Sequence, residues 1–361
     1  MSDRLLVGTR KGLFTLRRAR STWSIERTGF LGDPISNLLH DPHDGALYAA
    51  QALGHFGVKL QRSRDGGGTW QELPAPAFPK SEGEGEGDGP SVSYLFCLET
   101  GGADQPGWLW CGTIPGALFL SKDHGESWSL NQPLWDLPAR KAWMGGGFDQ
   151  SGVASICVDP RNSRHVTIGV STGGVWVSDD GAASWRAASD GMYAEYYPPP
   201  RNRDAEVQDV HRLVQCVAAP DRMWVQHHNG VFRSTDGARS WQEVTTIRPA
   251  KFGFAVAVHP KDPDTAWFVP GVKDECRIPV DAKMVVARTC DGARSFEVLT
   301  EGLPQSHAYD LVHRHGLAVD ETGACLAMGS TTGHLFVSEN GGDAWALVAG
   351  HLPPISCVRF G

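Results

Sequence analysis

A short sequence box that ends in an aromatic residue recurs along this chain of 361 residues. Six copies share a hydroxyl residue at the first position and Asp or Asn at the third: SRDGGGTW (63–70), SKDHGESW (121–128), SDDGAASW (178–185), STDGARSW (234–241), TCDGARSF (289–296) and SENGGDAW (338–345). A seventh, degenerate copy lies within 12–23, where Arg18 replaces the acidic residue. The closing aromatics follow one another at intervals of 47 to 58 residues, which indicates a repeat architecture.

Each box has short apolar runs on both sides, with Asp, Asn, Gly and Pro between them. In one repeat the runs ASICVDPRN, HVTIGVST and GVWVS precede the box, and a further short run follows it. Such runs are typical of strands joined by hairpins, and four strands in a repeat of about 50 residues describe a propeller blade. We therefore predict an all-β fold, a seven-bladed β-propeller of four-stranded antiparallel blades, that occupies residues 1–361 as a single domain.

The first repeat lacks an innermost strand, because the run LLVGTRK matches the second strand of the other repeats. The run ISCVRF (355–360) follows the last box and has no partner within its own repeat. We predict that this C-terminal strand joins the N-terminal blade, which closes the ring and removes an exposed sheet edge.

Composition limits the classes of function. The 43 Gly and 23 Pro suit a fold with many turns, and the net charge of -8 with mixed signs gives no basic patch for nucleic acid. No run approaches 18 apolar residues and the start has no apolar signal segment, so we expect no membrane partner and a cytoplasmic location. The eight Cys lie mostly in apolar runs without a CxxC pair, which indicates buried thiols and no zinc site.

The boxes resemble those of the Asp-box (BNR-repeat) β-propeller family, in the sialidase-like, glycosyl-hydrolase-like group. The resemblance covers essentially the whole chain, and it implies that the box is a turn between the third and fourth strands, on the face away from the active site. An Asp or Asn there accepts N–H bonds from its own turn, and Gly tolerates positive φ. Three boxes carry Ala after the Gly that follows Asp180, Asp236 and Asp291, and we expect altered turns there.

The opposite face, here called the loop face, is built from two sets of loops. One set joins the second strand to the third: 9–12, 51–57, 113–116, 171–174, 226–230, 272–283 and 330–333. The other set leads from the fourth strand to the next blade: 74–93, 131–150, 189–212 and 301–316. The acidic glycine run in 74–93 reads as a flexible, solvated loop. Small loops such as STGG (171–174) have little to offer chemically. Seven of the 14 His fall on this face, which favours a functional pocket at one mouth of the propeller.

We predict a hydrolase that acts on a small sugar-like or anionic substrate at this mouth, by a glycosidase-like acid/base mechanism. Carboxyl, phenol and imidazole groups that can exchange protons or attack are the catalytic candidates: Glu275, Tyr309, His228 and Asp281. Cationic and polar side chains that can hold an anion are the substrate-binding candidates: Arg10, Lys11, His55, His211, Arg212, His227, Asn229, Arg277, Lys283, Arg314 and His315. We expect no metal and no cofactor.

Two other classes of function stay open. A metal enzyme could hold a transition metal through His211, His227, His228 and His315, although adjacent residues of a strand point to opposite faces. A non-catalytic scaffold that binds a protein or a ligand is the second alternative, although a mouth rich in Arg, Lys and His favours a small polar or carbohydrate-like ligand.

Overall fold

The computed structural model describes residues 1–20, 22–80, 89–145 and 148–361. The acidic glycine run at 81–88 and two residues of the glycine triplet at 145–147, both predicted to be loops, lie outside the described residues.

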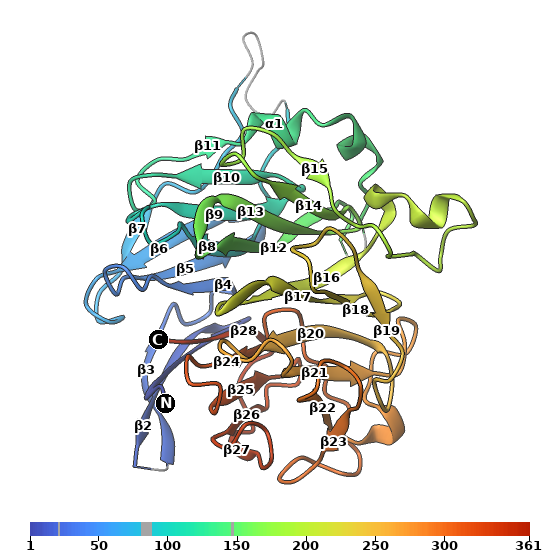
Figure 1. The fold of residues 1–361 in the computed structure, drawn as a ribbon. Coiled ribbons are helices and arrows are strands. Elements are labelled where there is room, and N and C mark those ends of the chain that lie inside the picture. The colour runs from blue at the N-terminus through green and yellow to red at the C-terminus, as the bar shows by residue number, and fades with distance from the viewer. Residues whose placement is uncertain (21, 81–88, 146–147) are drawn as a thin grey trace.

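The described residues form seven four-stranded antiparallel sheets arranged as a ring, which confirms the predicted seven-bladed propeller (Figure 1). Blade one orders its strands as β28 (Ile355–Phe360), β1 (Arg4–Thr9), β2 (Gly12–Ala19) and β3 (Thr22–Gly29). Blades two to four are β4 (Ile35–His40), β5 (Leu47–Ala52), β6 (Val58–Ser63) and β7 (Gln71–Leu73); β8 (Tyr94–Thr100), β9 (Leu109–Ile114), β10 (Leu118–Ser121) and β11 (Ser129–Leu130); and β12 (Gly152–Asp159), β13 (Asn162–Ser171), β14 (Gly174–Ser178) and β15 (Arg186–Ala187).

Blades five to seven repeat the same antiparallel order. They are β16 (Val210–Cys216), β17 (Ala219–His227), β18 (Gly230–Ser234) and β19 (Gln242–Val244); β20 (Phe252–Val258), β21 (Ala266–Gly271), β22 (Val286–Thr289) and β23 (Glu297–Leu299); and β24 (Leu317–Val319), β25 (Leu326–Gly329), β26 (Leu335–Ser338) and β27 (Ala346–Ala349).

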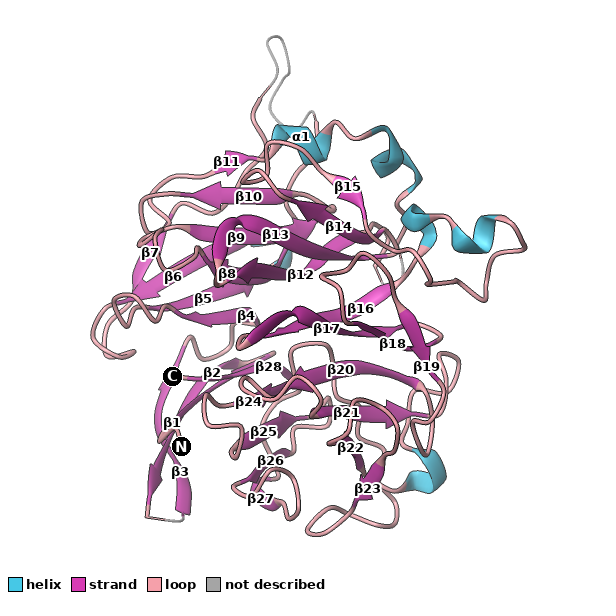
Figure 2. Ribbon diagram, in the orientation of Figure 1, coloured by secondary structure: helices cyan, strands magenta, loops and turns pink. Residues whose placement is uncertain are grey.

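The helical segments are short and lie in loops outside the sheets (Figure 2). They are α1 (Gln132–Trp135) and the 3-10 turns η1 (Gly54–Phe56), η2 (Pro138–Ala142), η3 (Arg201–Arg203), η4 (Ala205–Val207) and η5 (Val280–Ala282). Among the described residues, no helix has the length and apolar character needed to cross a membrane.

The ring closes as predicted, because β28 pairs antiparallel with β1 and the two ends of the chain lie side by side (Figure 1). In this register Val7 lies opposite Val358. A second link between the first and last blades comes from the degenerate first box, where the guanidinium of Arg18 pairs with the Glu339 carboxylate at 2.5 Å. The acid missing from that box is thus replaced by an ion pair to the neighbouring blade.

The boxes form hydrogen-bonded turns at the opposite end of each blade from the loop face. In the box of blade two, the Asp65 carboxylate accepts bonds from the Thr69 N–H at 2.9 Å and from the Ser63 hydroxyl at 2.8 Å. The expectation of altered turns in the Ala-containing boxes is wrong. Ala182 adopts φ 70°, as Gly67 does with φ 92°, and both N–H groups donate to the first Ser of their box. The same turn forms with Ala in the left-handed region.

The hydrophobic core lies between neighbouring blades, where the apolar faces of adjacent sheets pack together. The aromatic that closes each box belongs to this interface. The Trp241 indole of blade five donates to the Ala188 carbonyl that follows blade four, at 2.8 Å, and Trp128 makes the same link to Pro74 at 3.0 Å. These contacts support the structural interpretation of the boxes and leave the loop face as the place for chemistry.

Candidate functional site

A cavity of about 840 Å³ opens at the loop face, around the axis of the propeller. Its wall combines tips of loops between second and third strands, such as Arg10 and His228, with the first residues of innermost strands, such as His211 of β16. Seven of the candidates from sequence analysis line it: Arg10, Lys11, His211, His228, Arg277, Arg314 and His315.

The cavity is strongly cationic. Three arginines and Lys11 reach its wall, and Asp274 is the single carboxylate among its described lining residues. That carboxylate is already engaged, because the Arg277 Nε donates to Asp274 Oδ1 at 3.0 Å. The charge left over on the wall is positive, which suits an anionic ligand.

Arg314 is the most deeply placed of these cations, with 8% of its surface exposed. Its Nη2 donates to the Ser171 hydroxyl at 3.0 Å, and its guanidinium lies 5.3 Å from the ring centres of both Phe96 and Phe254. Burial lowers the pKa of Arg314, while the Asp209 carboxylate acts in the opposite direction. An arginine stays protonated in proteins, so this side chain is a fixed positive charge in the cavity wall.

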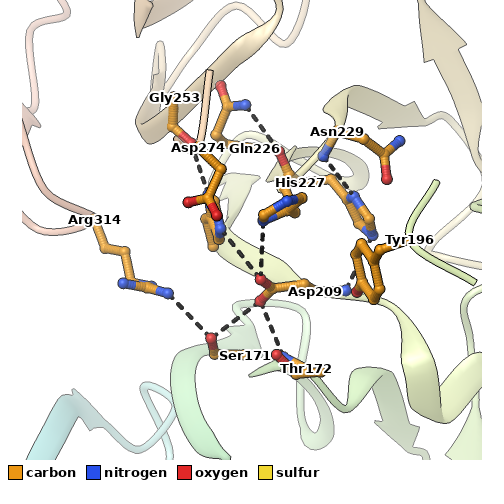
Figure 3. Close-up of polar contacts among 12 residues, drawn as sticks. Ser171, Thr172, Tyr196, Asp209, Gln226, His227, Asn229, Gly253, Asp274 and Arg314 are labelled. Atoms are coloured by element: carbon orange, nitrogen blue, oxygen red, sulfur yellow. Dashed lines mark hydrogen bonds and ion pairs between the residues drawn. The ribbon is translucent and has the colours of Figure 1, made fainter. Parts of the chain in front are cut away.

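Behind the wall, the buried carboxylate of Asp209 contacts several residues of the site (Figure 3). It lies two residues before His211 and is 3% exposed. Its Oδ1 accepts bonds from the Ser171 hydroxyl and the Thr172 N–H, each at 3.0 Å. Burial acts to raise the pKa of Asp209, but the charge and hydrogen bond of His211 outweigh it and hold that pKa well below its usual value. The carboxylate is therefore ionised.

The second oxygen of Asp209 faces two imidazoles. His211 Nε2 lies 3.3 Å from Asp209 Oδ2, and His228 Nδ1 lies 3.5 Å from the same atom. The hydrogen bond to Asp209 raises the pKa of His228, whereas burial lowers the pKa of His211. These three side chains bring one carboxylate oxygen and two ring nitrogens together beside the cavity.

His227 sits behind the wall and has a different role. Its ring is fully buried, packs edge-on against Phe232 and lies with Nε2 3.1 Å from the Asp209 N–H. Burial lowers the pKa of His227 to about 3, so the ring is neutral. Asn229 is also buried, and its amide oxygen accepts a bond from the Glu195 N–H at 3.3 Å. Both residues hold the loop that presents His228.

The remaining candidates are not brought into the cavity. Glu275 projects into solvent with 75% of its side chain exposed and pairs with Lys273 at 3.6 Å, and Tyr309 is 56% exposed. These side chains lie on loop tips outside the lining: Glu275, Tyr309, Asp281, Lys283 and His55. Arg212 faces a second cavity of about 500 Å³, which opens at the other mouth of the ring. The chemistry predicted for Glu275 with Tyr309 therefore has no shared concave site.

Several residues of the site were not among the candidates predicted from the sequence, above all Asp209 and the STGG loop. Ser171 and Thr172 of that loop hold Asp209, although the loop looked bland beside its relatives. One local signal was present, since Asp209 and His211 stand two apart in the sequence, a spacing that places side chains on one side of an extended segment.

Comparisons with known proteins support the fold. No family model matches the sequence, and no curated protein matches it. The structure is similar to a GH74 xyloglucanase from Xanthomonas campestris, with a TM-score of 0.67 and 16% identity over 96% of this chain. This chain spans 53% of that enzyme's length. It is also similar to YCF48 bound to D1 peptide, with a TM-score of 0.53 and 14% identity over 87% of this chain and 80% of the other.

Proposed function

We propose that the protein is a hydrolase that takes a small anionic substrate, one with a carboxylate or phosphate group, into the cavity at the loop face. The observation that carries the proposal is the charge of the wall, where Arg10, Lys11, Arg277 and Arg314 converge and only Asp274 opposes them among the described lining residues. Planar guanidinium groups bind carboxylate and phosphate oxygens in pairs, so they select for such anions.

Hydrolysis also needs a group that activates water near the bound anion. The cluster of Asp209, His211 and His228 is suited to this task, because two imidazoles of the wall meet the carboxylate of the buried Asp209 behind them. A glycosidase-like pair of carboxylic acids finds less support, since Glu275 and Asp281 stay outside the lining. The six boxes favour a place among Asp-box propellers, and the likeness to a xyloglucanase is compatible with a hydrolase.

Binding of defined small anions tests the proposal. We expect phosphate esters or small carboxylates to bind and neutral sugars not to bind in isothermal titration calorimetry. Arg277→Ala should weaken binding by about tenfold, as expected for one lost charge-assisted contact. Arg239→Ala, on an exposed box, is the matched control and should bind like the parent. Failure of every anion, or equal binding by Arg277→Ala, would contradict the proposal. Release of product from chromogenic phosphate and carboxylate esters then tests turnover.

A non-catalytic peptide-binding role is the second candidate, because large apolar side chains on the loop face are exposed. Phe56 is 84% exposed, Tyr309 56%, Met144 46%, Phe148 45% and Tyr196 43%. An acidic peptide would place its carboxylates in the cavity and its apolar residues on this rim. The double variant Phe56→Ser/Tyr309→Ser separates the two roles. If the protein binds an acidic peptide on this rim, the double variant should bind that peptide more weakly than the parent. Its affinity for small anions should stay the same, because the cavity is unchanged.

A further inference from the structure

The cluster of Asp209, His211 and His228 has the spacing of a metal site. Its three ligand atoms lie within 4.8 Å of one another, and the carboxylate oxygen is 3.3 Å and 3.5 Å from the two ring nitrogens. Tetrahedral zinc with bonds of about 2.0–2.1 Å separates its ligand atoms by roughly 3.4 Å. The two distances from the carboxylate oxygen match this separation, and the third, between the ring nitrogens, stays within 4.8 Å.

Hydrogen bonds around the cluster engage the atoms that face away from it, Asp209 Oδ1 and His211 Nδ1. They leave Asp209 Oδ2 and His211 Nε2 available to an ion. Asp209 Oδ1 is held by Ser171 and Thr172, so Oδ2 alone faces the imidazoles. His211 Nδ1 lies 2.7 Å from the Gly253 carbonyl, which can only accept, so Nδ1 carries the hydrogen. His211 would therefore bind an ion through Nε2, the ring nitrogen that faces the Asp209 carboxylate oxygen at 3.3 Å.

The surroundings of His211 also match those of a metal-binding histidine. Such a histidine usually donates its other ring N–H to a carboxylate or a backbone carbonyl, and His211 Nδ1 lies 2.7 Å from the Gly253 carbonyl. This contact fixes the orientation of the ring. The His211 side chain is only 3% exposed, so an ion held there would be largely shielded from bulk water.

We propose that Asp209, His211 and His228 bind one divalent first-row transition metal, with Zn²⁺ as the reference ion. Two imidazoles and one carboxylate would leave coordination positions open, and both imidazoles line the cavity, with 26% of the His228 side chain exposed. Given the proposed function, on which this point rests, water and the anionic substrate would take these positions. Such a metal would lower the pKa of bound water and polarise a substrate oxygen.

Cobalt and zinc binding to the untagged, chelator-treated protein tests the site. We expect one equivalent of Co²⁺ with the visible absorption of a low-coordinate N/O site, and displacement by one equivalent of Zn²⁺. His228→Gln should lower the affinity at least about 100-fold while keeping the circular dichroism spectrum, since its ring is partly exposed. Ser171→Ala, which frees the Asp209 carboxylate, should lower affinity about tenfold. His313→Gln, on the same wall but outside the cluster, should bind metal like the parent.

Three results would overturn the inference: no stoichiometric metal, unchanged affinity in His228→Gln, or an imidazolium at His211 in nitrogen-15 NMR spectra of the metal-treated protein. Anion titrations of the metal-free and metal-loaded protein keep this test separate from the proposed function. Metal binding without any anion binding would reject the substrate class and leave the metal site standing. Anion binding without metal binding would do the reverse.

Discussion

At the residue scale, neutral histidines buried near the cavity make the protein sensitive to acid. Burial lowers the pKa of His313 to about 4, with the charges of Arg314 and Arg277 acting in the same direction. Burial also lowers the pKa of His227 to about 3. Unfolding returns both rings to water, where the histidine pKa is about 6.5. The unfolded chain therefore binds more protons than the native protein once the pH falls below about 6.5.

We expect the free energy of unfolding to fall as the pH drops from 6.5 towards 4. Above pH 6.5 the His313 ring is neutral in both states and its titration costs no stability. At pH 5 it lowers the free energy of unfolding by about 1–2 kcal/mol. In His313→Gln this contribution disappears, so the loss of stability between pH 7.5 and pH 5 should be smaller than in the parent. Urea unfolding at both pH values measures the difference. Parallel losses in the two proteins would show that His313 does not titrate as its burial implies.

At the scale of the element, the box turn tolerates a residue with a side chain where glycine is the easier choice. Ala293 of blade six has φ 73° and still donates its N–H to the Thr289 hydroxyl at 3.0 Å. The left-handed conformation costs a residue with a Cβ roughly 1 kcal/mol. The hydrogen bonds of the turn and the packing of the closing aromatic outweigh that cost, and the turn is therefore the same in all these boxes.

Ala293→Gly should stabilise the protein by about 0.5–1 kcal/mol, because it relieves the left-handed strain at a partly buried position. Chemical denaturation midpoints measure the gain. Ala346→Gly is the matched control, since Ala346 is exposed in β27, has no positive φ, and should lose about 0.5–1 kcal/mol. A loss of stability in both variants would mean that the turn at Ala293 stores no strain.

At the scale of the whole molecule, stability depends on ring closure by β28. This strand buries Ile355, Cys357 and Val358 and covers the edge of β1. Each buried apolar side chain contributes about 1.5–3 kcal/mol, so the strand's share approaches the total stability of an ordinary protein. Its loss would also leave a row of unpaired backbone groups at the edge of β1.

Removal of residues 353–361 should abolish cooperative thermal unfolding and promote aggregation. A synthetic peptide with the sequence of 353–361 should restore the transition when it is added in trans, and a peptide of reversed sequence should not. Differential scanning calorimetry and light scattering report both effects. An unchanged unfolding midpoint in the truncated chain would show that the ring holds without its closing strand.

The sequence by itself determined the number of blades, the strands within them, the closing strand at 355–360 and the face that carries the long loops. These features follow from local periodicity and from a repeated turn whose chemistry lies within eight residues. It also placed His211, His228, Arg277 and Arg314 among the candidates, because each lies in a loop of the loop face and carries a side chain that can hold an anion.

Only the tertiary structure decided which candidates share a site. Ser171 and Asp209 lie in neighbouring blades, and Arg314 reaches Ser171 from blade seven across the propeller mouth. Glu275 looked equally suitable in the sequence, yet its loop turns it into solvent. Proximity across the axis of a propeller depends on the curvature of the whole ring and on loop conformation. Neither is encoded in any one repeat, so the residues that line the cavity are set by the arrangement of several blades around the axis.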